Sequence, residues 1–429
     1  MDDRLIPLMS HGYYLKNWMF RQPVERTWAA RTFSPLDAGC LRAAIMTLCS
    51  STIGAGALAL PYAVSRCGLL LGLLLTIVVG VSFMGYYRIL VRVSTGFESH
   101  SYLQVIEAYY GSGWKRTMEV FVLLFCTAMV AALETILCEL GLALLPTAIS
   151  PNSEATRFLF LTVLTACILF PLCRFPQLTS LRYVSLIPLM SITCVMLLSL
   201  YDLQDLQWDE IVWFKLDLSV CEAVCIMYFS FDASINIPAI HNELTKPSFK
   251  RMEKVIMRGL TLITTIYLLV GSFGYATNAD SVPSIFVLQG KSHWPIRISQ
   301  VLVALNIVVE VPLMVHPVRL CLEQMCLLAD GRLCVPGRFM LLPLLLLPVI
   351  AAAFVPNTVV YFELLGAVFT VTTGFVVPSK AYLALLFLKF SNSLVKKLAL
   401  FLWTTVLASI AVVCVFLHCA RYFHLLSLP

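Results

Sequence analysis

Polar and ionisable side chains occur within long apolar segments of the sequence. Glu310 lies near the middle of an apolar segment over residues 296–320, and Asn306 lies one helical turn earlier on the same face. Asp232 lies inside another apolar segment, over residues 215–240. A carboxyl group inside a membrane segment must be protonated or paired, and it faces a cavity or a partner rather than lipid. These residue types can bind a proton or a cationic group, so each marks a candidate functional position.

Glycines and small polar residues interrupt two of the apolar segments. They are Ser51, Thr52, Gly54, Ala55 and Gly56, followed by Pro61, in the first segment, and Phe229, Ser230 and Asp232, followed by Pro238, in the sixth. Backbone released from a helix in a membrane is tolerated only where it lines a cavity or meets protein. Paired breaks at equivalent places in two halves of a chain are typical of inverted-repeat transporters, and they lie at the substrate site. We therefore predict a substrate-binding site at the two breaks.

Two structural interpretations of these residues stay open. Gly54 and Gly56 can serve only as a close helix-packing contact, as small residues often do in membranes. Asp232 can cap the second half of its broken helix by accepting the N–H groups there. The presence of a matching break in the sixth segment favours the functional interpretation.

The elements that carry these residues are membrane-spanning helices. Among the 429 residues, 59% are hydrophobic and 13% are charged, which excludes a water-soluble globule of this size. Long unbroken apolar runs exclude an outer-membrane barrel, whose strands alternate. The net charge of +6 comes without a basic block, so we expect a lipid bilayer and not nucleic acid as partner. The 15 cysteines show no metal-binding spacing, so we expect reduced thiols and no bound metal. No group of residues resembles a metal site or a set of catalytic nucleophiles, so we expect no cofactor and no enzymatic activity.

Eleven apolar segments predict an all-α polytopic membrane protein with about 11 transmembrane helices. The segments are 40–66, 69–93, 117–146, 157–174, 181–201, 215–240, 255–277, 296–320, 338–356, 361–388 and 398–420. If the N-terminus is cytoplasmic, 24 of the 30 Lys and Arg residues fall on the inner side. Such an excess is the usual signature of orientation, so we predict a cytoplasmic N-terminus.

The spacing of the breaks divides the chain into two halves of five spans each. We predict a cytoplasmic tail over residues 1–38 and a transmembrane transporter domain over residues 39–421. Within the domain, repeat one covers about 40–201, repeat two about 215–390, and an extra helix about 398–420. The sequence has no apolar stretch near Met1, so we expect no cleaved signal peptide.

Three stretches resemble the amino acid/auxin permease family. They are residues 51–61 (STIGAGALALP), 228–244 (YFSFDASINIPAIHNEL) and 311–319 (VPLMVHPVR). The resemblance implies a five-plus-five inverted-repeat (LeuT-type) fold with broken helices 1 and 6. It also implies amino-acid transport driven by a proton or sodium gradient. The substrate carboxylate would then lie on the freed amides of the first break, and its amino group would meet the sixth break.

The sequence departs from the sodium-coupled relatives that it resembles. Those relatives carry Asn where Ser51 stands and Thr where Glu310 stands. Because a carboxyl can take up a proton, we predict proton coupling through Glu310 with Asn306, and sodium is less favoured. The open alternatives are a permanently paired structural Glu310, or a carboxylate that itself binds sodium.

The function predicted from these residues is a secondary active transporter of amino acids, a symporter that works by alternating access. The alternatives are a non-transporting amino-acid sensor or receptor of the same fold, and a sodium-coupled or facilitative carrier. The expected location is the plasma membrane or the vacuolar or lysosomal membrane.

Overall fold

The computed structural model describes most of the chain, and every regular element within the described residues is a helix. The described residues are 39–144, 154–174, 190–195, 197, 210–279, 282–286, 294–325, 337–388 and 394–422. The predicted tail over residues 1–38 and most of the predicted fifth span over 181–201 lie outside them. The all-α prediction is confirmed for the part of the chain that the structure describes.

Seven helices within the described residues are long and apolar enough to cross a membrane, and one bent pair of helices raises this number to eight. The seven are Leu69–Gly96, Ser112–Leu142, Ala155–Cys173, Ser219–Glu243, Phe249–Ala276, Thr358–Ala384 and Leu398–Leu417. Two further helices, α15 (Trp294–Met325) and α16 (Gly337–Phe354), lie at the predicted eighth and ninth spans. The count of eleven stays a prediction, because the predicted fifth span is largely not described.

The first span bends because its sequence does not continue one helix. Its first half, α3 (Leu41–Thr52), begins at Cys40, whose sulfur accepts a hydrogen bond from the first turn. After the glycine-containing break, a 3-10 helix η1 (Ala55–Ala59) leads into α4 (Leu60–Cys67), and the two halves meet at 55°. Pro61 lies in the first turn of α4, where N–H groups have no partner within the helix, so a residue without an N–H is tolerated.

The sixth span is broken in a similar way. Its first half, α12 (Ser219–Phe231), ends at Asp232, which has extended backbone with ψ of 119°. A short 3-10 turn, η5 (Ser234–Asn236), then leads into α13 (Ile237–Glu243). Pro238 again lies in the first turn of the second half. Both breaks fall where the sequence predicted them.

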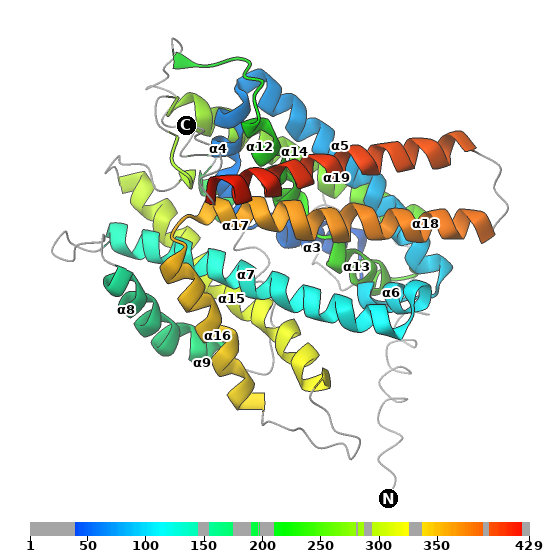
Figure 1. Cartoon of the computed structure of the whole chain (residues 1–429), viewed down its shortest axis with the longest axis horizontal. Helices are drawn as coiled ribbons and strands as arrows, with labels where there is room; N and C mark the ends of the chain where they lie inside the picture. The colour runs from blue at the N-terminus through cyan, green and yellow to red at the C-terminus, as the bar shows by residue number, and fades with distance from the viewer. Residues whose placement is uncertain are drawn as a thin grey trace, which may run out of the picture.

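The helices pack in two groups. The first, second, sixth and seventh spans form one group, which contains α3, α4, α5 (Leu69–Gly96), α12, α13 and α14 (Phe249–Ala276). The second group contains α7 (Ser112–Leu144), α8 (Glu154–Leu164), α9 (Phe170–Cys173), α15 and α16. Figure 1 shows α8, α9 and α16 at the lower left, with the long helix α7 crossing the lower half of the molecule. Each broken span belongs to the first group.

The tenth span contacts both groups. It consists of α17 (Thr358–Leu364), a π-helix η7 (Leu365–Val376) and α18 (Val377–Leu388). It runs beside α19 (Leu394–Tyr422), as the orange and red helices of Figure 1 show, and it packs against α12 and α7. Gly366 is needed for this contact, because a Cβ there would overlap the backbone of α12.

An aromatic cluster holds α5, α12 and the tenth span together beside the sixth break. Phe83 stacks on Phe231 at 6.0 Å between ring centroids and lies 4.9 Å from Phe375, and all three rings are fully buried. In a membrane such packing, rather than exclusion of water, drives helix association. The cluster therefore packs the end of the first half of the sixth span against α5 and the tenth span.

Candidate functional site

The two broken spans meet directly at their breaks. A Cβ added at Gly56 would lie 2.8 Å from Ser230 Oγ and 3.0 Å from both Ser230 Cα and Phe229 Cδ1. Phe229 in turn stacks on Phe362 of α17, with 4.8 Å between the ring centroids. The structure thus brings together the two sets of residues that the sequence singled out, and the contact requires a glycine at position 56.

Backbone amides are released at the start of η1. The first hydrogen bond of this turn runs from the Ala57 amide to the Gly54 carbonyl, at 3.2 Å. The amides of Gly54, Ala55 and Gly56 precede it, so they are the freed N–H groups of a helix start. Ala55 and Gly56 are buried, and Gly54 is half-buried. These amides can donate hydrogen bonds to a carboxylate.

The candidate hydroxyl groups already donate to their own helices. Ser51 Oγ and Thr52 Oγ1 both donate to the Leu48 carbonyl, at 3.0 and 2.8 Å. Ser230 Oγ donates to the Ile226 carbonyl at 2.8 Å. Each hydroxyl oxygen keeps lone pairs that can accept a hydrogen bond. In this arrangement the three groups are suited to an ammonium donor rather than to a carboxylate.

Asp232 holds the start of the 3-10 turn that leads into the second half of the sixth span. Its Oδ1 accepts hydrogen bonds from the Ser234 amide at 2.9 Å and from Ser234 Oγ at 2.6 Å. The second half-helix itself, α13, follows Asn236 and has no side-chain cap, so the capping interpretation stays open. Asp232 also lines a small pocket, whose other lining residues are Phe121, Val122, Phe125, Ile235, Phe369 and Thr373. This pocket joins the sixth break to α7 and to the tenth span.

Glu310 lies against the break of the first span. A Cβ added at Gly54 would lie 3.0 Å from Glu310 Oε1 and 3.7 Å from its Cδ. Glu310 Oε2 is buried, and no described residue donates a hydrogen bond to it. Asn306, one turn earlier on α15, is also buried. Glu310 and Gly54 belong to different packing groups, so the carboxyl lies between the two groups.

Two tyrosines that the sequence did not single out hold the broken backbone. The Tyr267 hydroxyl, from α14, donates to the Thr52 carbonyl at 3.0 Å and to the Ser230 carbonyl at 2.8 Å. The Tyr87 hydroxyl, from α5, donates to the Phe231 carbonyl at 2.8 Å. No short motif marks either residue, because each acts on a segment far away in the sequence.

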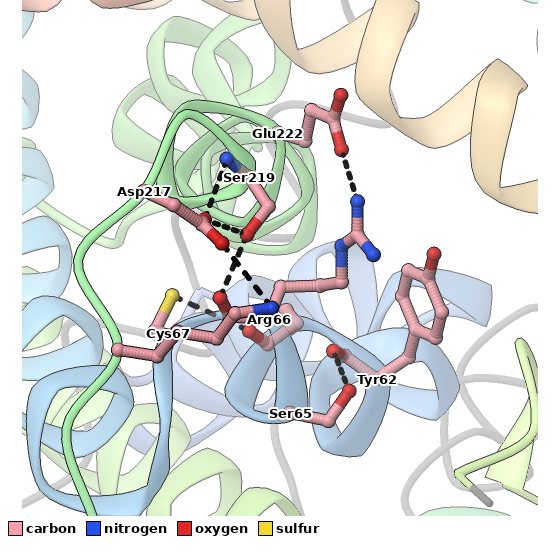
Figure 2. A network of polar contacts seen from close by, with 9 residues as sticks. Tyr62, Ser65, Arg66, Cys67, Asp217, Ser219 and Glu222 are labelled. Carbon is pink, nitrogen blue, oxygen red and sulfur yellow. Dashed lines mark hydrogen bonds and ion pairs between the residues drawn. The ribbon is translucent and has the colours of Figure 1, made fainter. Parts of the chain in front are cut away.

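A polar network ties the end of the first span to the start of the sixth (Figure 2). Arg66 Nη2 lies 2.9 Å from Glu222 Oε2, and the Glu222 side chain is only 1% exposed. Ser219 Oγ donates to the Arg66 carbonyl at 2.9 Å and also contacts Asp217 Oδ1. The hydrogen bonds from Ser219, and then the nearby Lys215, lower the pKa of Asp217. The network joins the two broken helices away from their breaks.

The fold and the site define a class of protein. Several helices are long enough to span a membrane, and the first and sixth spans are broken and meet inside the molecule. This is the architecture of a membrane transporter. The chain matches the family model of transmembrane amino acid transporter proteins over residues 38–420, and it belongs to that family.

Several known proteins are similar in sequence. The putative amino acid transporter AAT1 of Toxoplasma gondii is 30% identical over 302 residues, which cover 69% of this chain and 42% of that protein. Vacuolar amino acid transporter 6 of Saccharomyces cerevisiae is 24% identical over 66% of each chain. Human solute carrier family 38 member 10 is 23% identical over 79% of this chain and 32% of its own length. The chain therefore matches less than half of the length of two of these relatives.

A solved structure confirms the fold class. The manganese transporter of Eremococcus coleocola, in a mutant form, superposes with a TM-score of 0.53 at 12% identity. The superposition covers 89% of this chain and 88% of the other. At this identity the similarity concerns the fold alone, which is the helical transporter fold predicted from the paired breaks.

Proposed function

We propose that this protein is a secondary active transporter that moves amino acids in symport with protons by alternating access. The family supports the amino-acid substrate, and the broken spans support the location of its site. Proton coupling is supported by one observation, which carries the proposal. The Glu310 carboxyl lies against Gly54 of the first break, and its buried Oε2 has no donor among the described residues.

In the proposed complex, the substrate is held by the backbone of the two breaks. Its carboxylate accepts hydrogen bonds from the amides of Gly54, Ala55 and Gly56, where a helix start provides a partial positive charge. Its ammonium group donates to oxygens around Ser230, whose hydroxyl is already committed as a donor. The close contact between Gly56 and Ser230 places the two segments beside each other, so one small substrate can meet both of them.

Glu310 is the proposed proton carrier. Its buried Oε2 has no donor among the described residues, and no described ion pair includes it. Burial without a cation or donor disfavours the carboxylate, so the neutral acid fits this environment. When the two helix groups move relative to each other, the contact with Gly54 changes, and the carboxyl can ionise on exposure to water. Asn306 supplies a polar neighbour on the same helix face.

The Asp232 carboxylate is proposed to act first as a structural cap. It sets the position of Ser234 and therefore the start of the second half of the sixth span. Its place in the pocket beside α7 leaves it near the substrate, so it remains a candidate binding residue.

The proposed location is the plasma membrane or a vacuolar or lysosomal membrane, with the N-terminus in the cytoplasm. The Lys and Arg distribution supports this orientation. One relative is named a vacuolar transporter, which supports the second of these locations.

Reconstitution into liposomes tests the coupling. A pH difference of one unit corresponds to about 1.4 kcal/mol per proton, so one-for-one symport can accumulate a neutral amino acid about tenfold. We expect the wild-type protein to accumulate substrate under this gradient. Glu310→Gln should still exchange labelled for unlabelled substrate, because Gln mimics the neutral acid, but it should not accumulate substrate. Glu134→Gln is the matched control. Glu134 Oε2 is likewise buried without a donor among the described residues, and its Oε1 accepts a hydrogen bond from Thr165 at 3.3 Å, but the carboxyl nearest to Gly54 is that of Glu310.

The outcomes separate the alternatives. Normal pH-driven accumulation by Glu310→Gln would refute the coupling role. If both Glu310→Gln and Glu134→Gln lose accumulation, the loss follows from removing any buried carboxyl and not from the position of Glu310 beside Gly54. Accumulation that follows a sodium gradient at equal pH would replace the proton by sodium. A wild-type protein that binds amino acids but neither accumulates nor exchanges them would be a sensor.

A further inference from the structure

The Tyr267 hydroxyl connects the two breaks. It donates to the Thr52 carbonyl of the first span at 3.0 Å and to the Ser230 carbonyl of the sixth span at 2.8 Å. We propose that Tyr267 is a positioning residue for the substrate, which sets the distance between the two broken backbones. This inference rests on the proposed function, because it assumes that the substrate binds where the two breaks meet.

Both carbonyls need a donor because the helices stop there. In a continuous helix, the Ser230 carbonyl would accept the Ser234 amide, but that amide donates to Asp232 Oδ1 instead. Thr52 is the last residue of α3, so its carbonyl is among those that lack a helical partner. A single phenolic hydrogen is therefore shared between two acceptors that the breaks leave unsatisfied.

Without the hydroxyl, the Thr52 and Ser230 carbonyl oxygens, which both lie within hydrogen-bond distance of it, would lose this donor. Two oxygens with partial negative charge repel, and an unsatisfied carbonyl is costly in a membrane interior. The contact between Gly56 and Ser230 would then have to hold the breaks together at this point. We expect the spacing of the substrate-binding groups to relax, and affinity to fall.

The environment of Tyr267 suits this role. Its ring is 1% exposed and packs edge-on against Phe231, with 4.9 Å between centroids and 75° between planes. The residue thus contacts both breaks, and the proposed proton carrier Glu310 lies against the first of them, at Gly54.

Tyr102 provides a matched control. It is also 1% exposed, and its hydroxyl donates to the Thr373 carbonyl at 2.8 Å. Tyr→Phe at either position removes one buried hydroxyl and takes a donor away from backbone carbonyl oxygen. Tyr267 joins the first break to the sixth and Tyr102 does not, so only the change at Tyr267 should alter the geometry between the breaks.

The test compares Tyr267→Phe and Tyr102→Phe in liposomes, with KM and Vmax for the amino acid that the wild-type protein accumulates. Vmax is normalised to the amount of folded protein. For Tyr267→Phe we expect KM to rise about five- to tenfold, because this is the change in affinity that corresponds to the loss of one hydrogen bond. For Tyr102→Phe we expect KM to change by less than about twofold. Thermal unfolding with and without substrate should show the same order, with a smaller substrate-induced stabilisation in Tyr267→Phe only.

A merely structural role would lower the amount of folded protein in both variants and leave KM unchanged in both, and this result would overturn the inference. If Tyr267→Phe does not fold, Phe231→Leu is measured, because it removes the edge contact that orients the Tyr267 ring and keeps the hydroxyl. An unchanged KM in that variant would also overturn the inference. Failure of the wild-type protein to transport any amino acid would instead overturn the proposed function.

Discussion

Adding one methyl group at Gly56 is the most direct perturbation of the contact between the breaks. In Gly56→Ala the new Cβ would lie 2.8 Å from Ser230 Oγ and 3.0 Å from Ser230 Cα. The Cα is backbone, so it cannot rotate away as a flexible side chain does. Because carbon atoms pack at about 3.5 Å or more, the first and sixth spans must separate by about 0.5 Å at this point.

The size of the effect follows from this displacement. Overpacking of a well-packed interior costs about 1–3 kcal/mol. Binding groups must be held to within about 0.5 Å to keep their geometry, so the required separation uses up that tolerance. If about 1.4 kcal/mol of the cost falls on the bound state, the dissociation constant for the substrate rises about tenfold.

Equilibrium binding of the labelled amino acid to the purified protein measures this effect, with two other glycines as controls. In Gly54→Ala the Cβ meets the end of the Glu310 side chain at 3.0 Å, and a carboxyl group can rotate, so we expect a smaller loss of affinity than at Gly56. In Gly85→Ala the Cβ has nothing within 4 Å. Gly85 lies inside α5, where Ala is expected to stabilise the helix by about 0.5–1 kcal/mol without a change in affinity.

We predict the order Gly56, Gly54, Gly85 for the loss of affinity. Wild-type affinity in a folded Gly56→Ala protein would refute this, since the breaks would then not need their close contact. Equal losses in all three variants would also contradict it, because the three added methyl groups meet different neighbours.

Two further predictions concern stability. Arg66→Met removes the ion-pair partner of the Glu222 side chain, which is 1% exposed. We expect a loss of about 2 kcal/mol in the free energy of unfolding, measured by denaturant titration in detergent. No loss would show that the ion pair is not stabilising. Asp232→Asn should keep most of the stability, because Asn still accepts the hydrogen bond from the Ser234 amide. Asp232→Ala should lower the free energy of unfolding by about 1 kcal/mol. Equal losses in thermal unfolding of the two variants would show that the charge of Asp232 matters rather than this hydrogen bond.

The sequence could predict the breaks because their causes are local. Glycine, small polar residues and a proline in the first turn of the second half are readable without any tertiary contact, and both breaks occur where these residues stand. The position of Glu310 near the middle of its helix was also readable, although its contact with Gly54 was not. Periodicity places a residue on a helix face, but it does not say which span that face meets.

The sequence could not predict the tyrosines that support the breaks. Tyr267 acts on Thr52 and Ser230, which are 215 and 37 residues away in the chain. A tyrosine in an apolar run is indistinguishable from an ordinary core residue until the packing is known. For the same reason the sequence did not reveal that the hydroxyls of Ser51 and Ser230 already donate to their own helices.

The π-helix of the tenth span makes this span shorter than an α-helix with the same number of residues would be. A π-helix bonds residue i to i+5 instead of i+4, so each turn of Leu365–Val376 holds more residues than an α-helical turn would. Conversion of part of this segment to α-helix would lengthen the span and rotate its two ends relative to each other, while every backbone group kept a partner within the membrane. The span can thus change its reach between α12 and α7 by rewinding rather than by breaking.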